Sequence, residues 1–305
     1  MTVEALVSVT ALLSFIANLV ATERWVAISE RRGLLARDLH KLGSVMAARV
    51  GGIPLTIIFI TQASIISTLL GLPAPLTMLP IFFSSIGLVD DLIGLSNLEK
   101  IVLSGIPFLL LHSSFPPFEP FSSFLTHQLT LFLLGTYYVN STNTFAGFNG
   151  LEAGTSLIIS LALSMILLAE GEFRGSIYLL SLFLLLLSFL KYNWYPAKAF
   201  PGNVLTFLCG GAIATASFSY SLYWELVILS LPQGFDFLLK VISWGRTKEK
   251  VPTSVSSDGK LVAPPNLSLP SLLIRLGVRE EHLLVILLLS IELSLALLLL
   301  INLPR

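Results

Sequence analysis

The sequence has few charged residues, a single cysteine and none of the common phosphate-loop or zinc motifs. Asp, Glu, Lys and Arg make up 12% of its 305 residues, whereas soluble domains contain roughly 25%. Cys209 has no second cysteine with which to form an internal disulfide. No G-x-x-x-x-G-K-[ST] loop, H-E-x-x-H helix or paired Cys/His motif occurs. These absences argue against a water-soluble domain and against a P-loop or zinc-motif enzyme.

Apolar residues are abundant, at 54% of the chain, and the mean hydropathy is +0.86. Several apolar runs approach the ~20 residues that a helix needs to cross a bilayer. We therefore predict an all-α, polytopic integral membrane protein with about ten transmembrane helices. The expected spans are 3–22, 51–70, 73–90, 101–113, 127–142, 155–170, 174–191, 203–219, 221–240 and 282–302.

Basic residues are distributed unevenly between the two sides that these spans define. Sixteen of the eighteen Lys and Arg residues lie in or beside loops on one side, and only Arg174 and Arg305 lie on the other. The positive-inside rule places the basic side in the cytoplasm and both termini outside. An incorrect number of spans would have scrambled this asymmetry.

No soluble domain or internal repeat is evident, so we expect one membrane-embedded domain over residues 1–305. Its largest cytoplasmic loop, 241–281, ends in SLPSLLIRLGVREEH (268–282), whose leucines predict a short amphipathic helix. Three basic residues near the start of this loop are either an ordinary charge run or a phosphate-binding group: Arg246, Lys248 and Lys250.

Two adjacent acids, Asp90 and Asp91, lie where the third predicted span reaches the cytoplasmic face. They repel each other, and the negative end of the helix dipole disfavours both. Acids at a membrane boundary commonly have a cationic partner or a function. One interpretation is a pair of solvated helix-end charges. The functional alternative is a Mg²⁺ site or an acid/base group with Lys100 as its counter-charge.

The loop NSTNTFAGFNGLEAG (140–154) is rich in amides and glycines. Asn and Gly are common turn residues, so an ordinary connection is one interpretation. Asn140, Asn143, Asn149 and Glu152 are nevertheless a dense set of oxygen ligands and hydrogen-bonding groups for a short loop. Such groups suit a hard cation, or a nucleotide base that lies against the backbone.

The segment KYNWYPAKAFPGN (191–203) combines aromatic residues with an amide at the start of a new span. Tyr192 and Trp194 fit an interfacial aromatic belt. Phe200 differs because Pro201, Gly202 and Asn203 follow it. A base could stack on this ring while a phosphate approaches the helix N-terminus.

Taken together, these segments resemble the polyprenyl-phosphate N-acetylhexosamine-1-phosphate transferase superfamily, and in particular the UDP-GlcNAc–dolichyl-phosphate GlcNAc-1-phosphotransferases. The resemblance covers essentially the whole chain. Its motifs are DLHK (38–41), GLVDD (87–91), NTFAGFNGLEAG (143–154), NWYPAKAFPGN (193–203) and the basic last loop. It implies that a lipid-linked phosphate attacks the sugar-bound phosphate of UDP-GlcNAc. The products would be UMP and GlcNAc-diphosphate-lipid, the first step of lipid-linked oligosaccharide assembly for N-glycosylation.

The resemblance also implies roles for individual positions. Asn143 and Asn203 correspond to ligands of Mg²⁺, with Mn²⁺ as the alternative cation. Asp90 and Asp91 correspond to the paired acids of the reaction centre, and Lys100 to a phosphate contact. The uracil would be read by Gly147 and Asn149 and stacked on Phe200. The full set of expected substrate-binding residues is Asn140, Gly147, Asn149, Glu152, Phe200, Arg246, Lys248 and Lys250.

One position departs from the family pattern. Relatives have an aspartate in an F-x-G-D motif as the second metal ligand, and this chain has Asn203 there. An amide oxygen can bind Mg²⁺ but brings no charge, so we expect weaker metal binding. Asp90 and Asp91 would then supply the negative charge.

Two alternatives remain open at this level. The donor could be another UDP-N-acetylhexosamine used for cell-envelope glycans, or the protein could be a non-catalytic lipid-binding or transport protein. We expect a prokaryotic plasma membrane, and in particular an archaeal one, with the endoplasmic reticulum as the alternative. We also expect a cytoplasmic active site, a homodimer by family resemblance, and no nucleic-acid partner.

Overall fold

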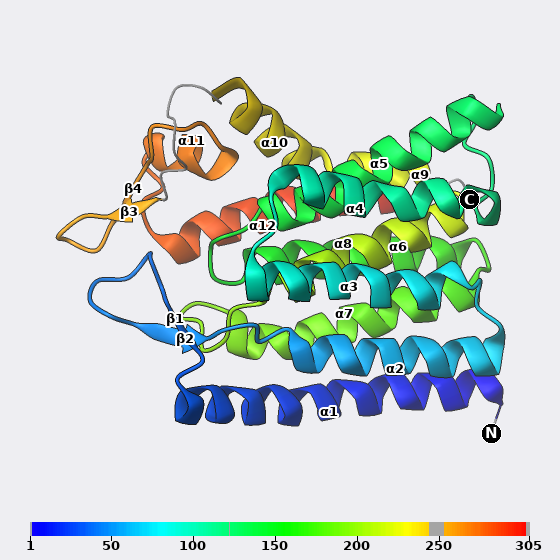
Figure 1. Cartoon of the computed structure of the whole chain (residues 1–305), viewed down its shortest axis with the longest axis horizontal. Coiled ribbons are helices and arrows are strands. Elements are labelled where there is room, and N and C mark those ends of the chain that lie inside the picture. The colour runs from blue at the N-terminus through cyan, green and yellow to red at the C-terminus, as the bar shows by residue number, and fades with distance from the viewer. Residues whose placement is uncertain (1, 122, 244–252, 303–305) are drawn as a thin grey trace.

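The computed structural model describes residues 2–121, 123–243 and 253–302, and helices dominate it. Long helices lie side by side in one bundle, with the short strands of the described residues gathered at one end (Figure 1). The helices are α1 (Val3–Arg32), α2 (Ile53–Leu70), α3 (Pro75–Ile93), α4 (Asn97–Leu110), the 3-10 turn η1 (His112–Ser114), α5 (Phe124–Thr144), α6 (Leu151–Ala169), α7 (Phe173–Asn193), α8 (Gly202–Ser219), α9 (Tyr223–Leu229), α10 (Leu231–Ser243), α11 (Leu269–Arg275) and α12 (Glu281–Ile301). The strands form two antiparallel hairpins, β1 (Leu35–Arg37) with β2 (Met46–Ala48) and β3 (Ser254–Val255) with β4 (Leu261–Val262).

Seven of the described helices are long and apolar enough to cross a membrane: α1, α2, α3, α6, α7, α8 and α12. The pair α9 and α10 passes the same test as one span with a bend of 60°. These helices confirm the predicted all-α polytopic membrane protein. Helix α4 has 14 residues, fewer than the ~20 that span a bilayer. The count of ten spans, the outward termini and the cytoplasmic side therefore remain predictions.

Local sequence signals determine where several of these helices begin. Pro54 and Pro75 stand in the first turns of α2 and α3, where a missing N–H costs nothing. Ser96 caps α4 in a capping box with Glu99. Hydrogen bonds from Ser96 hold the pKa of Glu99 below its ordinary value. The ordered first turn of α4 places the next residue, Lys100, beside the end of α3.

Helix α8 lies at the centre of the bundle, and 83% of its residues are buried inside the protein. Glycines let the neighbouring helices approach closely. A Cβ atom on Gly210 would lie 2.9 Å from the Cα of Val139 in α5, and one on Gly87 of α3 would lie 2.2 Å from the carbonyl oxygen of Asn203. Small residues commonly allow such contacts between membrane helices. The ends of α3, α5 and α8 are thereby held together.

The loops at the strand-bearing end rest on a packed scaffold. Strand β2 is tied to the segment before α8, because Ala48 donates to the carbonyl of Lys198 and accepts from the N–H of Phe200, both at 2.9 Å. The predicted amphipathic segment forms α11, which packs against α10 and α12. A second apolar core joins the loop between α5 and α6 to β4, α11 and α12: Phe145, Phe148, Leu151, Leu261, Ile274, Leu284, Val285 and Leu288.

Candidate active site

The carboxylate of Asp91 caps the N-terminus of α8. Its Oδ1 accepts from the backbone N–H of Asn203 and its Oδ2 from that of Val204, both at 2.9 Å. These amides have no partner within their own helix, and the positive end of the helix dipole favours a carboxylate there. Asp91 therefore joins the end of α3 to the start of α8.

The neighbouring acid, Asp90, is buried and paired with a lysine. Its Oδ2 lies 2.6 Å from Lys100 Nζ, and its Oδ1 accepts from the N–H of Leu95 at 2.7 Å. Only 7% of Asp90 is exposed, so the ammonium compensates a charge that water reaches poorly. The two adjacent acids thus have different partners and hold different elements together.

The two predicted metal ligands, Asn143 and Asn203, are linked through one threonine. The hydroxyl of Thr206 lies 2.7 Å from Asn143 Oδ1 and 3.2 Å from the carbonyl oxygen of Asn203. The structure therefore gathers five of the predicted residues where the ends of α3 and α5 meet the starts of α4 and α8. We call this group the acidic centre: Asp90, Asp91, Lys100, Asn143 and Asn203.

The ligand atoms of the acidic centre suit a hard divalent cation. They are carboxylate and amide oxygens, which Mg²⁺ prefers over nitrogen or sulfur. Asp90 and Asp91 already have Lys100 and backbone N–H groups as partners. Asn143 and Asn203 would contribute amide oxygens, which carry no charge. The residues present therefore fit a divalent cation with few charged ligands.

The loop between α5 and α6 is shaped by a glycine and an acid. Gly147 has φ +109°, a conformation that residues with side chains rarely adopt. Its N–H donates to Glu152 Oε1 at 2.8 Å. Glu152, in the first turn of α6, therefore holds the backbone of a position that we expect to contact the base.

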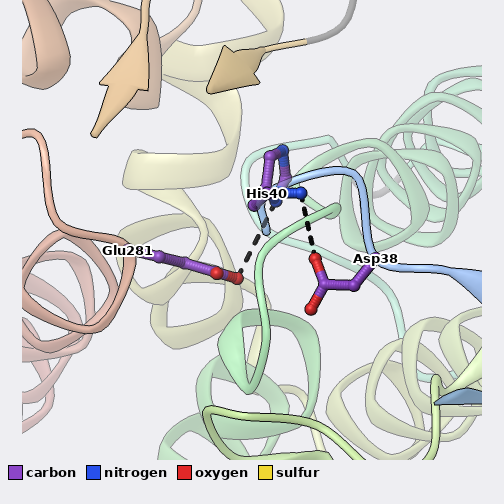
Figure 2. A group of neighbouring side chains, drawn as sticks. All are labelled: Asp38, His40 and Glu281. Atoms are coloured by element: carbon purple, nitrogen blue, oxygen red, sulfur yellow. Dashed lines mark hydrogen bonds and ion pairs between the residues drawn. The ribbon is translucent and has the colours of Figure 1, made fainter. Parts of the chain in front are cut away.

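A second group of polar residues surrounds Asn149, and we call it the loop cluster: Asp38, His40, Lys41, Asn149 and Glu281. The N–H of Asn149 donates to Glu281 Oε1 and its Nδ2 donates to Asp38 Oδ2, both at 2.8 Å. Lys41 forms ion pairs with both acids. The N–H of His40 donates to Asp38, and its ring nitrogen lies 3.8 Å from Glu281 (Figure 2). The cluster thus ties together three segments that are far apart in the chain.

Three members of the loop cluster also have the arrangement of a metal site. Asp38, His40 and Glu281 each place one ligand atom within 4.8 Å of the others. The ammonium of Lys41, however, already contacts both carboxylates. A metal ion would have to compete with this cation, so the geometry favours an ion-pair network that holds the loops.

Asn140 and Phe200, two further predicted site residues, belong to neither of these groups. Asn140 donates from Nδ2 to the hydroxyl of Ser104 at 2.6 Å, which joins α5 to α4. Phe200 is partly buried beside β2. The basic residues predicted to bind phosphate lie outside the described residues: Arg246, Lys248 and Lys250.

Several residues near the site received no role from the sequence. Thr206 follows Asn203 by three positions in α8, so helical periodicity could have placed both on one face. Lys240 joins Asp236, at 2.5 Å, to the carbonyl oxygen of Thr144, at 2.6 Å. No sequence pattern indicated a role for Glu281, because its partner Asn149 is 132 positions away.

Comparison with known proteins identifies the family. The sequence model of glycosyl transferase family 4 matches residues 74–221, the stretch from the start of α3 to just beyond α8. A protein of Methanocaldococcus jannaschii named as a glycosyltransferase is 32% identical over 260 residues, which cover 82% of each chain. This chain belongs to glycosyl transferase family 4.

Other relatives of this family 4 member have more specific names. A protein of Sulfolobus acidocaldarius is 27% identical over 312 residues, 94% of this chain and 93% of the relative. One of Dictyostelium discoideum is 27% identical over 239 residues, 63% of this chain and 59% of the relative. Both are named as UDP-N-acetylglucosamine–dolichyl-phosphate N-acetylglucosaminephosphotransferases. The family match contains Asp90, Asp91, Asn143 and Asn203, and it leaves out Asp38 and Glu281 of the loop cluster.

Proposed function

We propose that this protein transfers GlcNAc-1-phosphate from UDP-GlcNAc to a polyprenyl phosphate of the dolichyl type, releasing UMP and forming GlcNAc-diphosphate-lipid. The observation that carries the proposal is the acidic centre, whose five predicted residues come from four helices and lie together in space. The names of relatives that match nearly the whole chain support the choice of substrates. The product would begin lipid-linked oligosaccharide assembly for N-glycosylation.

In this proposal the acidic centre binds the phosphates of the donor. Asn143 and Asn203 would hold Mg²⁺, or Mn²⁺, and Asp90 and Asp91 would provide negative charge close by. A bound divalent cation neutralises charge on the phosphates during transfer. Lys100 lies 2.6 Å from Asp90 and would turn its ammonium toward a phosphate oxygen. The lipid phosphate oxygen attacks the sugar-bound phosphorus, and the phosphorus–oxygen bond to UMP breaks.

The loop between α5 and α6 would bind the nucleotide. Gly147 and Asn149 would contact the uracil and Phe200 would stack on it, while Glu152 keeps the loop in shape through Gly147. Asn140 would support the site by joining α5 to α4. The basic residues of the last loop would reach the pyrophosphate and the sugar: Arg246, Lys248 and Lys250.

The membrane setting follows from the charge asymmetry of the sequence. We place the site at the cytoplasmic face, where the basic loops lie, so that a soluble nucleotide sugar meets a lipid phosphate that arrives from the bilayer. A prokaryotic, and in particular archaeal, plasma membrane is the proposed location, and a homodimer is the proposed assembly.

The direct test uses protein purified in detergent with dolichyl phosphate, UDP-GlcNAc and Mg²⁺, and follows both UMP and the lipid product. We expect UMP only when lipid and metal are both present. Asp91→Asn should reduce the rate at least ~100-fold, because a misplaced helix end disturbs the reacting geometry. Glu4→Gln, an exposed acid in the first turn of α1, is the matched control and should keep its activity.

Two outcomes would change the proposal. Folded protein that forms no product with several UDP-sugars and polyprenyl phosphates would indicate a lipid-binding, transport or catalytically silent member of the family. Product formed with another UDP-N-acetylhexosamine but not with UDP-GlcNAc would keep the reaction and replace the donor.

A further inference from the structure

The side-chain amide of Asn149 is held in one orientation by Asp38. Asn149 Nδ2 donates to Asp38 Oδ2 at 2.8 Å. A carboxylate accepts hydrogen bonds and cannot donate them, so only the nitrogen of the amide can face it. Rotating the amide by half a turn would place Asn149 Oδ1 against a carboxylate oxygen. The hydrogen bond would be lost and two acceptors would repel each other.

Asp38 is itself fixed by its surroundings. It is 3% exposed, its Oδ1 accepts from the N–H of His40 at 3.0 Å, and the ammonium of Lys41 lies 3.4 Å from its Oδ2. The backbone of Asn149 is held as well, through its N–H to Glu281. The loop cluster therefore uses the backbone N–H of Asn149 and one of the two N–H bonds on its Nδ2. Among the described residues, none donates a hydrogen bond to Asn149 Oδ1.

We propose that Asp38 determines nucleobase specificity by orienting Asn149 so that Oδ1, an acceptor, is the atom offered to the base. The inference rests on the proposed function, in which Asn149 contacts the base of a uridine nucleotide. Uracil carries an N–H donor at N3, whereas cytosine has an unprotonated acceptor nitrogen at the same position. A fixed protein acceptor pairs with uracil and leaves two acceptors facing each other when cytosine is bound.

An unrestrained asparagine would not make this distinction. Its amide oxygen and nitrogen are similar in size, so rotation by half a turn would offer an NH₂ donor to cytosine. Discrimination by hydrogen bonding is strong only when the site cannot adapt and a mismatched base leaves buried polar groups unpaired. The bond from Asn149 to Asp38 removes this freedom, which makes Asp38 a positioning residue that acts through Asn149.

The test measures binding of UDP and of CDP, each with Mg²⁺, to the full-length protein in detergent by titration calorimetry. The wild-type protein should bind UDP more tightly than CDP. Asp38→Asn is nearly isosteric and lets position 38 either accept or donate, so both orientations of Asn149 become available. We expect the ratio of the affinity for UDP to the affinity for CDP to fall at least ~tenfold. This change corresponds to the free energy of one mismatched hydrogen bond.

A reciprocal exchange separates specificity from a general loss of structure. Asn149→Asp alone places two carboxylates side by side and should weaken the binding of both nucleotides. In Asp38→Asn/Asn149→Asp, the amide introduced at position 38 can donate to the carboxylate introduced at position 149, whose oxygens are all acceptors. This double variant should regain the preference for UDP. A merely structural role of Asp38 would change both affinities together and leave their ratio unchanged.

Each outcome bears on a different claim. If folded Asp38→Asn keeps the wild-type ratio, or if the double variant fails to regain it, Asp38 does not set the specificity. A wild-type protein that binds UDP and CDP equally also overturns the inference, although the transfer reaction could still stand. A wild-type protein that binds neither nucleotide and releases no UMP instead overturns the proposed function.

Discussion

The acidic centre and the loop cluster both contain two carboxylates and one lysine, yet their charges are arranged differently. In the acidic centre Asp91 is satisfied by two backbone N–H groups, and Asp90 alone pairs with a lysine, whose side chain is 20% exposed. In the loop cluster a single ammonium, that of Lys41, contacts both carboxylates and is 12% exposed. In the loop cluster one cation thus bridges both carboxylates, whereas in the acidic centre one carboxylate is held by a lysine and the other by a helix N-terminus.

This difference separates two tasks that a charged cluster can have. A network in which one ammonium bridges two carboxylates can hold loops in place, and removing that ammonium leaves buried charges uncompensated. A centre built on the N-terminus of a helix keeps a local positive potential and neutral amide oxygens, which suit a phosphate and a cation. We therefore expect changes in the acidic centre to act mainly on catalysis, and changes in the loop cluster to act mainly on stability and nucleotide binding.

The largest effect should come from separating the helices that build the acidic centre. In Gly87→Ala, the new Cβ would lie 2.2 Å from the carbonyl oxygen of Asn203, so α3 and α8 must move apart. A displacement of roughly 1 Å can cost about 100-fold in rate, and we expect at least that loss in UMP release. Gly171→Ala, in the turn between α6 and α7, is the comparison, because its Cβ meets no atom within 4 Å and it should lose only about 1–2 kcal/mol of stability through its positive φ. Equal activity in both variants would mean that the close approach of α3 and α8 is not needed.

A smaller effect on rate, with a larger effect on stability, should follow from removing the shared cation of the loop cluster. Lys41→Met leaves Asp38 and Glu281 facing each other without an ammonium, and breaking a buried pair costs about 3 kcal/mol. We expect a lower temperature of thermal inactivation and about tenfold less activity, since an anchor of the nucleotide loop is lost.

The matched controls for this prediction change charge in two ways. Lys260→Met removes an exposed lysine in the turn between β3 and β4, and should leave thermal inactivation unchanged. Lys41→Met/Glu281→Gln also removes one of the two carboxylate charges and should recover part of the loss. Thermal stability that is the same in Lys41→Met and Lys260→Met would show that the network does not hold the loops.

The smallest effect should come from adding charge to the acidic centre. Asn203→Asp introduces a carboxylate in the first turn of α8, which the helix dipole favours and which binds Mg²⁺ more strongly than an amide. We expect the Mg²⁺ concentration for half-maximal UMP release to fall a few-fold. Asn302→Asp, at the end of α12, is the control and should not alter the Mg²⁺ dependence. An unchanged Mg²⁺ requirement in Asn203→Asp would remove Asn203 from the metal ligands.

Much of the acidic centre could be predicted because its members stand at helix ends, where local patterns are informative. Asp90, Asp91 and Asn143 were recognisable as polar residues at the ends of apolar runs, and Asn203 as an amide just after a Pro-Gly pair. The sequence could not show that Asp91 caps α8, since that contact joins residues 112 and 113 positions apart. The loop cluster was missed as a group, although its first segment, DLHK (38–41), was visible as a motif.

The sequence by itself determined that this protein folds in a membrane, and it determined the order of the helices along the chain. Long apolar runs have no stable place in water, and their spacing and flanking charges depend only on local composition. Only the tertiary structure decided which polar groups meet. Burial leaves carboxylates such as Asp38 and Glu281 with few partners, and those partners are supplied by close packing of distant segments. The types of polar residue at this end of the bundle could therefore be predicted from the sequence. Which of these residues contact one another became visible only in the fold.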